Sequence, residues 1–262
     1  MKKTLLAAAA AVMLAGGSGA ALAVDIGGLQ VPTGQTFAVG QVYENVVTQV
    51  GDVLQGYGKV DSIGSFAVSG LCTDCELTYR FTDYRVTSIS ASEVKFTGGM
   101  ISFYLGAGAF NNFNTANAGG SAGDLIEATD GTLFLSLMGH AIDAAGNTFV
   151  GTGRDIGTVF PTGFGTGLAD VNMAAGGIAN AFFNTNSVNA LFGGGNADFQ
   201  LGSSFSGLNP VYPGECPGGA ACVRGSADFT GAVAAIPEPE TYALMLAGLG
   251  AVGFVARRRR NR

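Results

Sequence analysis

The chain has 262 residues and a formal net charge of −6, with 43 glycines, one histidine and no tryptophan. The acidic balance excludes a strongly basic nucleic-acid-binding protein. Collagen is excluded because the glycines follow no three-residue period and prolines number only 7.

The N-terminus has the three parts of a secretory signal peptide. Lys2 and Lys3 form a basic start, an apolar run covers 5–15, and an Ala-Leu-Ala sequence ends at Ala23. The apolar run is short for a membrane span, and the Ala-x-Ala end is typical of a cleavage site. The sequence therefore predicts a signal peptide over 1–23 that signal peptidase removes after Ala23.

The segment 24–236 predicts an all-β body, because no stretch sustains a helical apolar period and short alternating runs are frequent. Within 77–86 the apolar residues change from odd-numbered to even-numbered positions, which indicates a bulge near Asp83. Gly98-Gly99 is expected to form a hairpin turn. The expected strands are 41–50, 53–60, 77–86, 94–96, 101–105, 133–138, 148–151, 197–205 and 223–233.

Short strands separated by glycine-rich turns favour a single-domain antiparallel β-sandwich or jelly roll over 24–236. Residues 160–195 break the strand pattern, so we expect long loops there, with one short helix around 168–183.

The four cysteines form two close pairs, Cys72 with Cys75 and Cys216 with Cys222. In the cytosol such pairs would suggest a zinc site or a redox motif. In an exported chain, an even number of cysteines in tight local pairs favours two loop-closing disulfides.

Two short motifs match catalytic or cofactor patterns without the context that these patterns need. Ser121 lies in a G-x-S-x-G match at 119–123, and Asp130 and His140 follow in hydrolase order, but the match falls in an Asn/Gly/Ala-rich loop. The G-x-G-x-x-G match at 248–253 lies in an apolar tail without a βαβ unit. We therefore expect no catalytic residue and no nucleotide cofactor. His140 is expected to be a hydrogen-bonded residue at a strand end.

Other side chains are candidates for binding. Asp124, Glu127 and Asp130 crowd one loop, and such oxygen-rich loops can hold Ca²⁺. Their spacing is not that of an EF-hand, so a solvated loop is favoured over a Ca²⁺ site. Tyr57, Tyr79, Tyr84 and Tyr104 are candidate platforms for a glycan, although packing within the sheet is favoured for most of them.

The C-terminus places three features in order. They are the triplet Pro237, Glu238 and Pro239, an uncharged stretch over 242–256, and the cluster Arg257, Arg258, Arg259 and Arg260. A 15-residue helix reaches about 22 Å, short of a hydrocarbon core of about 30 Å. We expect a marginal transmembrane helix over 242–256 in the inner membrane, with the arginines cytoplasmic and 24–236 outside.

This tail resembles the PEP-CTERM sorting signal of Gram-negative bacteria. In that family, a membrane protease-transpeptidase called exosortase recognises the tail and cuts near the Pro-Glu-Pro triplet. The resemblance covers 237–262. It implies that Pro237, Glu238 and Pro239 are the recognition triplet, that the arginines stop transfer, and that the protein reaches the cell surface or the extracellular matrix.

Without its two ends the chain is strongly acidic. Residues 24–236 contain 6 Lys and Arg against 17 Asp and Glu, a balance of −11. Such a surface repels nucleic acid and attracts divalent cations. We expect a non-enzymatic surface or matrix protein of biofilms or flocs. The alternatives are a carbohydrate-binding module for exopolysaccharide and an exported hydrolase.

Overall fold

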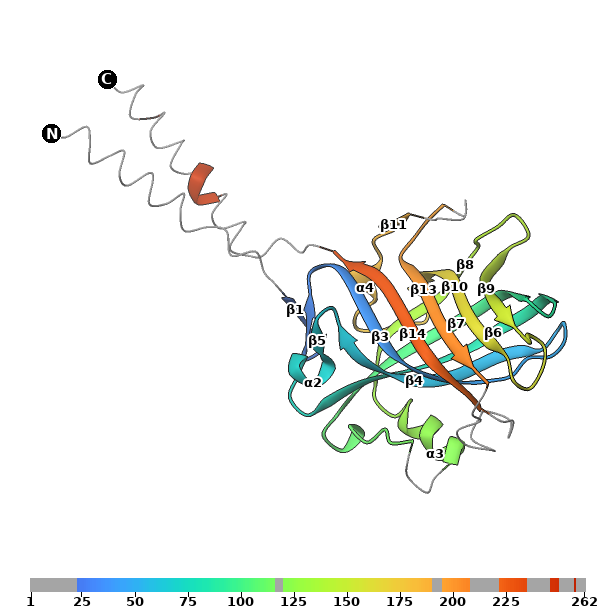
Figure 1. Ribbon diagram of the computed structural model, residues 1–262. Coiled ribbons are helices and arrows are strands. Elements are labelled where there is room, and N and C mark those ends of the chain that lie inside the picture. Colours follow the sequence, from blue (N-terminus) through green and yellow to red (C-terminus); the bar gives the residue numbers. More distant parts are fainter. Residues whose placement is uncertain are drawn as a thin grey trace.

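The computed structural model describes residues 23–115, 120–189, 195–207, 222–234, 246–249 and 257, which are mainly β-strand (Figure 1). The strands are β1 (Ala23–Ile26), β2 (Leu29–Pro32), β3 (Gly34–Asn45), β4 (Val53–Ile63), β5 (Phe66–Ala67), β6 (Cys75–Ile89), β7 (Glu93–Ala107), β8 (Thr132–His140), β9 (Asn147–Arg154), β10 (Thr162–Val171), β11 (Val188–Asn189), β12 (Asn196–Ala197), β13 (Phe199–Ser206) and β14 (Cys222–Val233). The helices between residues 23 and 234 that the structure describes are α2 (Val68–Leu71), the 3₁₀ turn η1 (Gly108–Phe110), α3 (Gly120–Glu127) and α4 (Asn180–Phe183).

The long strands form one closed antiparallel barrel, and the prediction of a sandwich or jelly roll is therefore wrong. Neighbours follow the order β13-β14-β3-β4-β6-β7-β8-β10, and β10 pairs back to β13 from Thr162–Ser206 to Ala169–Phe199. The all-β prediction is confirmed. Sequence alternation could not separate the two architectures, because both place alternate residues inside.

Strands β8 and β9 share one position in the barrel wall. β8 pairs with β7 from Met100 to Leu105 and with the end of β10. β9 pairs with β7 from Glu93 to Thr97 and with the start of β10. The two strands therefore lie one after the other between β7 and β10, which keeps the wall continuous.

Glycines inside strands make room for aromatic rings in the barrel. A Cβ at Gly58 would overlap Tyr79, one at Gly165 would overlap Phe149, and one at Gly231 would overlap Phe199. The rings of these partners are buried or half-buried in the main apolar core. The expectation that glycines mainly separate strands is therefore incomplete, since small and large residues also alternate across the interior, as small barrels require.

The bulge near Asp83 is confirmed. Asp83 has a φ of 64°, and the register between β4 and β6 shifts by one residue at this level. The expected hairpin turn at Gly98-Gly99 is wrong, because both glycines lie inside β7, with φ values of 75° and 94°. They lie beside the β6 bulge, and the Tyr84 ring occupies the place of a Gly99 side chain. In both β6 and β7, the residues that point into the barrel therefore change between odd-numbered and even-numbered positions at the same level.

The region 160–195 differs most from expectation. Instead of a long loop, it contains β10, which pairs with β8, β9 and β13, and the only helix described there is the four-residue α4. The inward positions of the first half of β10 are Gly163, Gly165 and Gly167, whereas Phe164 is 71% exposed outside. Because glycines point inward and a phenylalanine points outward, the alternation of apolar residues does not predict this strand.

Segments outside the barrel wall close one end of its interior. The β1–β2 hairpin contributes Leu29 and Val31, which are almost fully buried, and α4 contributes Phe183. Val31 and Phe183 line a small cavity together with inward residues of β6 and β7. The opposite end is formed by the last residues of β3 and β13 and the first residues of β4 and β10.

Both predicted routing segments lie largely outside the described residues. The signal peptide is described only at Ala23, which begins β1, and the C-terminal tail only at 246–249 and Arg257. None of the described helices has the length and apolarity needed to cross a bilayer. The transmembrane helix over 242–256 and the division at residues 23 and 236 stay predictions.

Candidate functional site

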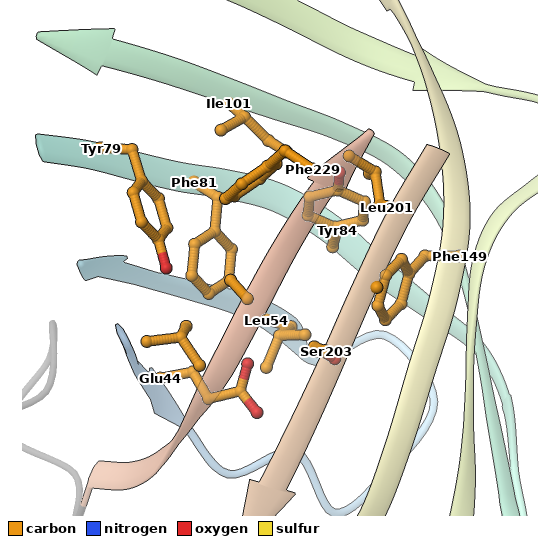
Figure 2. Close-up of a pocket in the computed structure, with 13 residues that line it drawn as sticks. Glu44, Leu54, Tyr79, Phe81, Tyr84, Ile101, Phe149, Leu201, Ser203 and Phe229 are labelled. Atoms are coloured by element: carbon orange, nitrogen blue, oxygen red, sulfur yellow. The ribbon is translucent and has the colours of Figure 1, made fainter. Parts of the chain in front are cut away.

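A cavity of about 60 Å³ lies inside the barrel between β3, β4, β6, β13 and β14 (Figure 2). Its walls are mainly aromatic and aliphatic. The lining residues are Val42, Glu44, Leu54, Tyr79, Phe81, Tyr84, Ile101, Phe149, Leu201, Gly202, Ser203, Ala227 and Phe229. The cavity is therefore an apolar chamber that contains one carboxylate.

Glu44 faces this chamber because it follows Val42 by two residues on β3 and so has the same inward parity. It pairs with Val223 of β14 and Gly56 of β4. Figure 2 shows its carboxylate pointing towards Leu54 and Ser203. Within the described part of the chain no hydrogen bond or ion pair reaches this carboxylate, and burial alone raises the pKa of Glu44 to about 8.

Two tyrosines of β6 line the same chamber. The Tyr79 hydroxyl donates a 2.6 Å hydrogen bond to the carbonyl oxygen of Gln41, which fixes the ring across the interior. Burial and the nearby Glu44 carboxylate raise the pKa of Tyr79. Burial also raises the pKa of Tyr84, so both rings are neutral at physiological pH.

A second cavity of about 40 Å³ adjoins the first. The two share Glu44, Leu54, Phe149 and Ser203. The second cavity extends to the segments 46–47 and 156–157 at the end of the barrel opposite the β1–β2 hairpin. Glu44 thus lies between the chamber and the loops, and the arrangement suits the binding of a small molecule.

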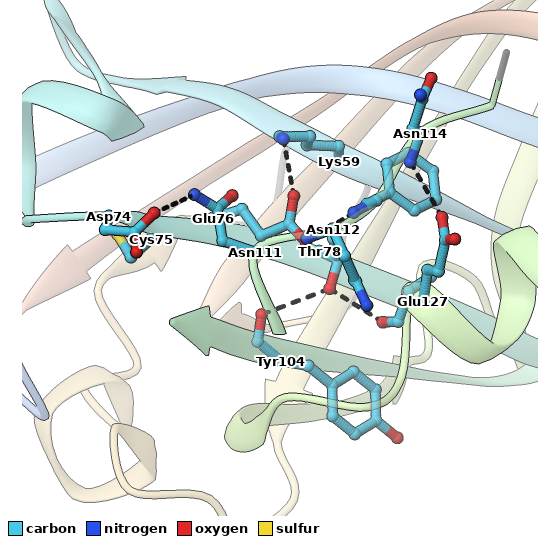
Figure 3. Close-up of polar contacts among 12 residues, drawn as sticks. Lys59, Asp74, Cys75, Glu76, Thr78, Tyr104, Asn111, Asn112, Asn114 and Glu127 are labelled. Atoms are coloured by element: carbon cyan, nitrogen blue, oxygen red, sulfur yellow. Dashed lines mark hydrogen bonds and ion pairs between the residues drawn. The ribbon is translucent and has the colours of Figure 1, made fainter. Parts of the chain in front are cut away.

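A separate polar network fixes residues 108–115 and 120–131, here called the segment 108–131, to the outside of β4 and β6 (Figure 3). Glu76 is 1% exposed and accepts a 2.7 Å contact from Lys59 Nζ. The backbone N–H groups of Asn112 and Phe113 donate to its other oxygen, both at 2.9 Å. The Thr78 hydroxyl donates to Ala128 O at 2.8 Å. These contacts satisfy the buried carboxylate, so the network is structural.

The three carboxylates considered for Ca²⁺ have separate neighbours in the network. Asp124 accepts from the Tyr57 hydroxyl at 3.2 Å, Glu127 from the Asn114 N–H at 3.0 Å, and Asp130 from Asn112 Nδ2 at 3.0 Å. No group of three acidic, His or Cys side chains suited to a metal ion occurs in the described ranges. The choice between a solvated loop and a Ca²⁺ site stays a prediction.

His140 is the last residue of β8, and its Nδ1 lies 2.7 Å from Asp170 Oδ2. The prediction of a hydrogen-bonded strand-end histidine is confirmed. Asp130 precedes the same strand, and ten residues of extended chain place it on the order of 30 Å from His140. Ser121 lies in α3, which precedes Asp130 in the chain and is therefore still further from His140 in sequence. Ser121, Asp130 and His140 therefore do not form a triad, since Asp130 and His140 lie at opposite ends of β8.

The candidate glycan platforms are mostly inside the protein. Tyr57, Tyr79 and Tyr84 are at most 4% exposed, which confirms the preference for packing at these positions. Tyr57 stacks on Tyr43 beneath the segment 108–131, with ring centroids 5.7 Å apart. Tyr104 is half-buried.

Cys72 and Cys75 lie within disulfide-bonding distance, with Cα atoms 5.9 Å apart, as predicted. Asp74 in this short loop accepts a 3.0 Å hydrogen bond from Asn111 Nδ2 (Figure 3), so the loop contacts the segment 108–131. The predicted disulfide of Cys216 with Cys222 falls outside the described side chains, as do Pro237, Glu238, Pro239 and the arginines 258–260.

Glu44 was not among the candidate site residues predicted from the sequence. A usable signal was present, because the expected strand at 41–50 places Val42 and Glu44 on one face, and a carboxylate on an apolar face is unusual. The other strands that surround Glu44 are distant in sequence, so their aromatic side chains could not be assigned to one chamber.

Comparison with known proteins identifies the C-terminal tail. The model of the PEP-CTERM protein-sorting motif matches residues 235–260. Searches of curated proteins and of solved structures give no significant match. The motif marks an exported, cell-surface-associated protein that exosortase processes. The chain is therefore a PEP-CTERM domain-containing protein.

Proposed function

We propose that this protein is a non-enzymatic component of the cell surface or extracellular matrix and contributes to biofilm or floc formation. The observation that carries the proposal is a sorting motif at 235–260 attached to a body of net charge −11. An acidic protein outside the cell binds divalent cations, and these cations link it to acidic polymers or to further copies.

The distribution of charge supports this role. Within the described ranges, Glu76 pairs with Lys59 and Glu93 pairs with Lys95. Several acidic residues outside these two pairs are exposed on different strands and loops. They are Asp25, Asp61, Asp74, Asp83, Asp143 and Asp155. Spread over the surface in this way, they favour bridging between molecules over one internal cation site.

The test compares a deletion strain with strains that express the intact chain or a Pro237→Ala, Glu238→Ala, Pro239→Ala variant. We expect deletion to reduce Ca²⁺-dependent aggregation of cells, and the intact chain to restore it. The triple variant should stay unprocessed and fail to restore aggregation. Aggregation of the deletion strain at the parental level would disprove the matrix role. Cytoplasmic recovery of the intact chain would contradict the sorting route.

A second candidate function is binding of exopolysaccharide by the outer face of β10. The exposed Phe164 ring lies between two hydroxyl-bearing neighbours in register, Thr152 of β9 and Ser204 of β13. An aromatic face beside hydroxyl groups suits the apolar and polar sides of a sugar ring. Phe164→Ala should abolish binding on a glycan array, whereas Phe110→Ala, at another ring that is 52% exposed, should not. Equal binding by both variants would exclude this face.

A further inference from the structure

The interior chamber combines aromatic faces with a carboxylate that the fold itself does not use. Two almost fully buried carboxylates, Glu76 and Asp198, are surrounded by several donors each. Glu76 accepts three contacts, and Asp198 accepts backbone N–H groups from Val171, Thr185 and Asn186 at 2.6–2.8 Å. Glu44 is half-buried, lines the chamber, and has no such partner within the described part of the chain. A carboxylate without a protein partner beside apolar walls is available to a ligand.

The chemistry of the walls indicates what would complement Glu44. Tyr79, Phe81, Tyr84, Phe149 and Phe229 present π-systems to the chamber. Aromatic faces attract organic cations, and a carboxylate neutralises the positive charge. We infer that the Glu44 chamber is a binding site for a small alkylammonium ion, with its ammonium group at the Glu44 carboxylate and its alkyl group against the aromatic rings.

The volume limits the size of this ligand. A cavity of about 150 Å³ admits benzene, which has six heavy atoms, so a chamber of about 60 Å³ accommodates about two or three. Including the adjoining 40 Å³ cavity raises this limit to about four heavy atoms. The size range therefore ends near propylammonium. A ligand this small binds with a Kd no tighter than roughly 40 µM.

Other occupants fit the chamber less well. An anion would meet the Glu44 carboxylate, and a neutral apolar molecule would leave it desolvated. Ca²⁺ takes six to eight oxygen ligands, whereas the lining supplies few oxygens besides Glu44, Ser203 and two tyrosine hydroxyls. An organic cation is the class that satisfies both the carboxylate and the rings.

Proton linkage gives the site a distinct signature. The titratable groups that face Glu44 are Tyr79 and Tyr84 of β6, and no other lining residue of either cavity carries a charge. Because burial raises the pKa of Glu44 to about 8, its carboxyl group is mostly protonated at pH 7 when no ligand is bound. Binding of a cation favours the ionised form and releases a proton. The affinity for an alkylammonium ion should therefore fall about tenfold for each pH unit below 8.

The experiment measures binding of propylammonium chloride and of 1-propanol to the purified full-length protein by ligand-observed NMR, at constant ionic strength. At pH 9 propylammonium should bind at least tenfold more tightly than 1-propanol. Glu44→Gln should weaken propylammonium binding at least tenfold and leave 1-propanol unchanged. Ala227→Leu, which fills the chamber and retains Glu44, should abolish binding of both compounds. Thermal unfolding of each variant checks that it is folded.

Three results would overturn the inference: no saturable binding of propylammonium at pH 9, equal affinity for both compounds, or equal affinity of the intact protein and Glu44→Gln. The matrix role is tested independently, since a strain expressing Glu44→Gln should aggregate with Ca²⁺ as the intact strain does. Loss of ligand binding and loss of aggregation are thus separate outcomes.

Discussion

Among single residues, Glu44 couples the interior to pH. Its pKa is raised from 4.5 to about 8 by burial. Between these values the folded protein retains a proton that the unfolded chain releases. The stability that this proton provides is complete below pH 4.5 and is lost as the pH rises through 8. The free energy of unfolding should therefore decrease with pH, by at most about 1.4 kcal/mol per unit.

Glu44→Gln should flatten this dependence, because glutamine is neutral throughout the range. Urea unfolding between pH 5 and pH 8 measures it. At pH 8 the variant should be at least as stable as the intact protein. Glu93→Gln, at a half-buried glutamate of a surface pair 3.5 Å from Lys95, should leave the slope unchanged. An identical slope for the intact protein and Glu44→Gln would contradict the proposed environment of Glu44.

Strand glycines are the second feature at this scale. A Cβ at Gly165 would overlap the Phe149 ring, whereas one at Gly202 on the outer face would lie 3.4 Å from Asp228 Cβ, an ordinary contact. Gly165 and Gly202 belong to the paired strands β10 and β13. Gly165→Ala should lower the free energy of unfolding by about 1–3 kcal/mol. Gly202→Ala should change it by less than about 1 kcal/mol. Equal effects in denaturant unfolding would contradict inward packing of Gly165.

At the scale of elements, the segment 108–131 depends on Glu76. Glu76→Gln removes the charge that Lys59 and two backbone N–H groups contact. We expect a loss of about 1–3 kcal/mol and faster proteolysis within 108–131, detected by mass spectrometry of the fragments. Glu93→Gln is the matched control, because an exposed ion pair contributes less than about 1 kcal/mol. Unchanged cleavage in Glu76→Gln would show that other contacts hold the segment.

Also at this scale, strand features were predicted correctly from the sequence where apolar residues occupy the inward face of the strand. The bulge at Asp83 was predictable because apolar residues change parity on the inward face of β6. β10 was not, because glycine occupies its inward positions and Phe164 faces outward. Gly98-Gly99 was mistaken for a turn because a paired bulge and a hairpin both use glycine at positive φ.

For the whole molecule, the intact mass of protein recovered from cells and medium tests the processing route. We expect loss of residues 1–23, loss of the tail from a site near Pro237–Pro239, and the mass decrease of two disulfides. The motif at 235–260 supports the C-terminal event. A mass that retains the whole tail in every fraction would contradict cleavage by exosortase.

The sequence by itself determined the export route, the all-β class, the local Cys72–Cys75 pairing and the acidic balance of the body. These properties depend on contiguous residues or on composition. Closure into a barrel and the chamber around Glu44 were decided only by the tertiary structure. Both depend on pairing between distant strands, such as β10 with β13 and β3 with β14, and local alternation does not encode which strands become neighbours.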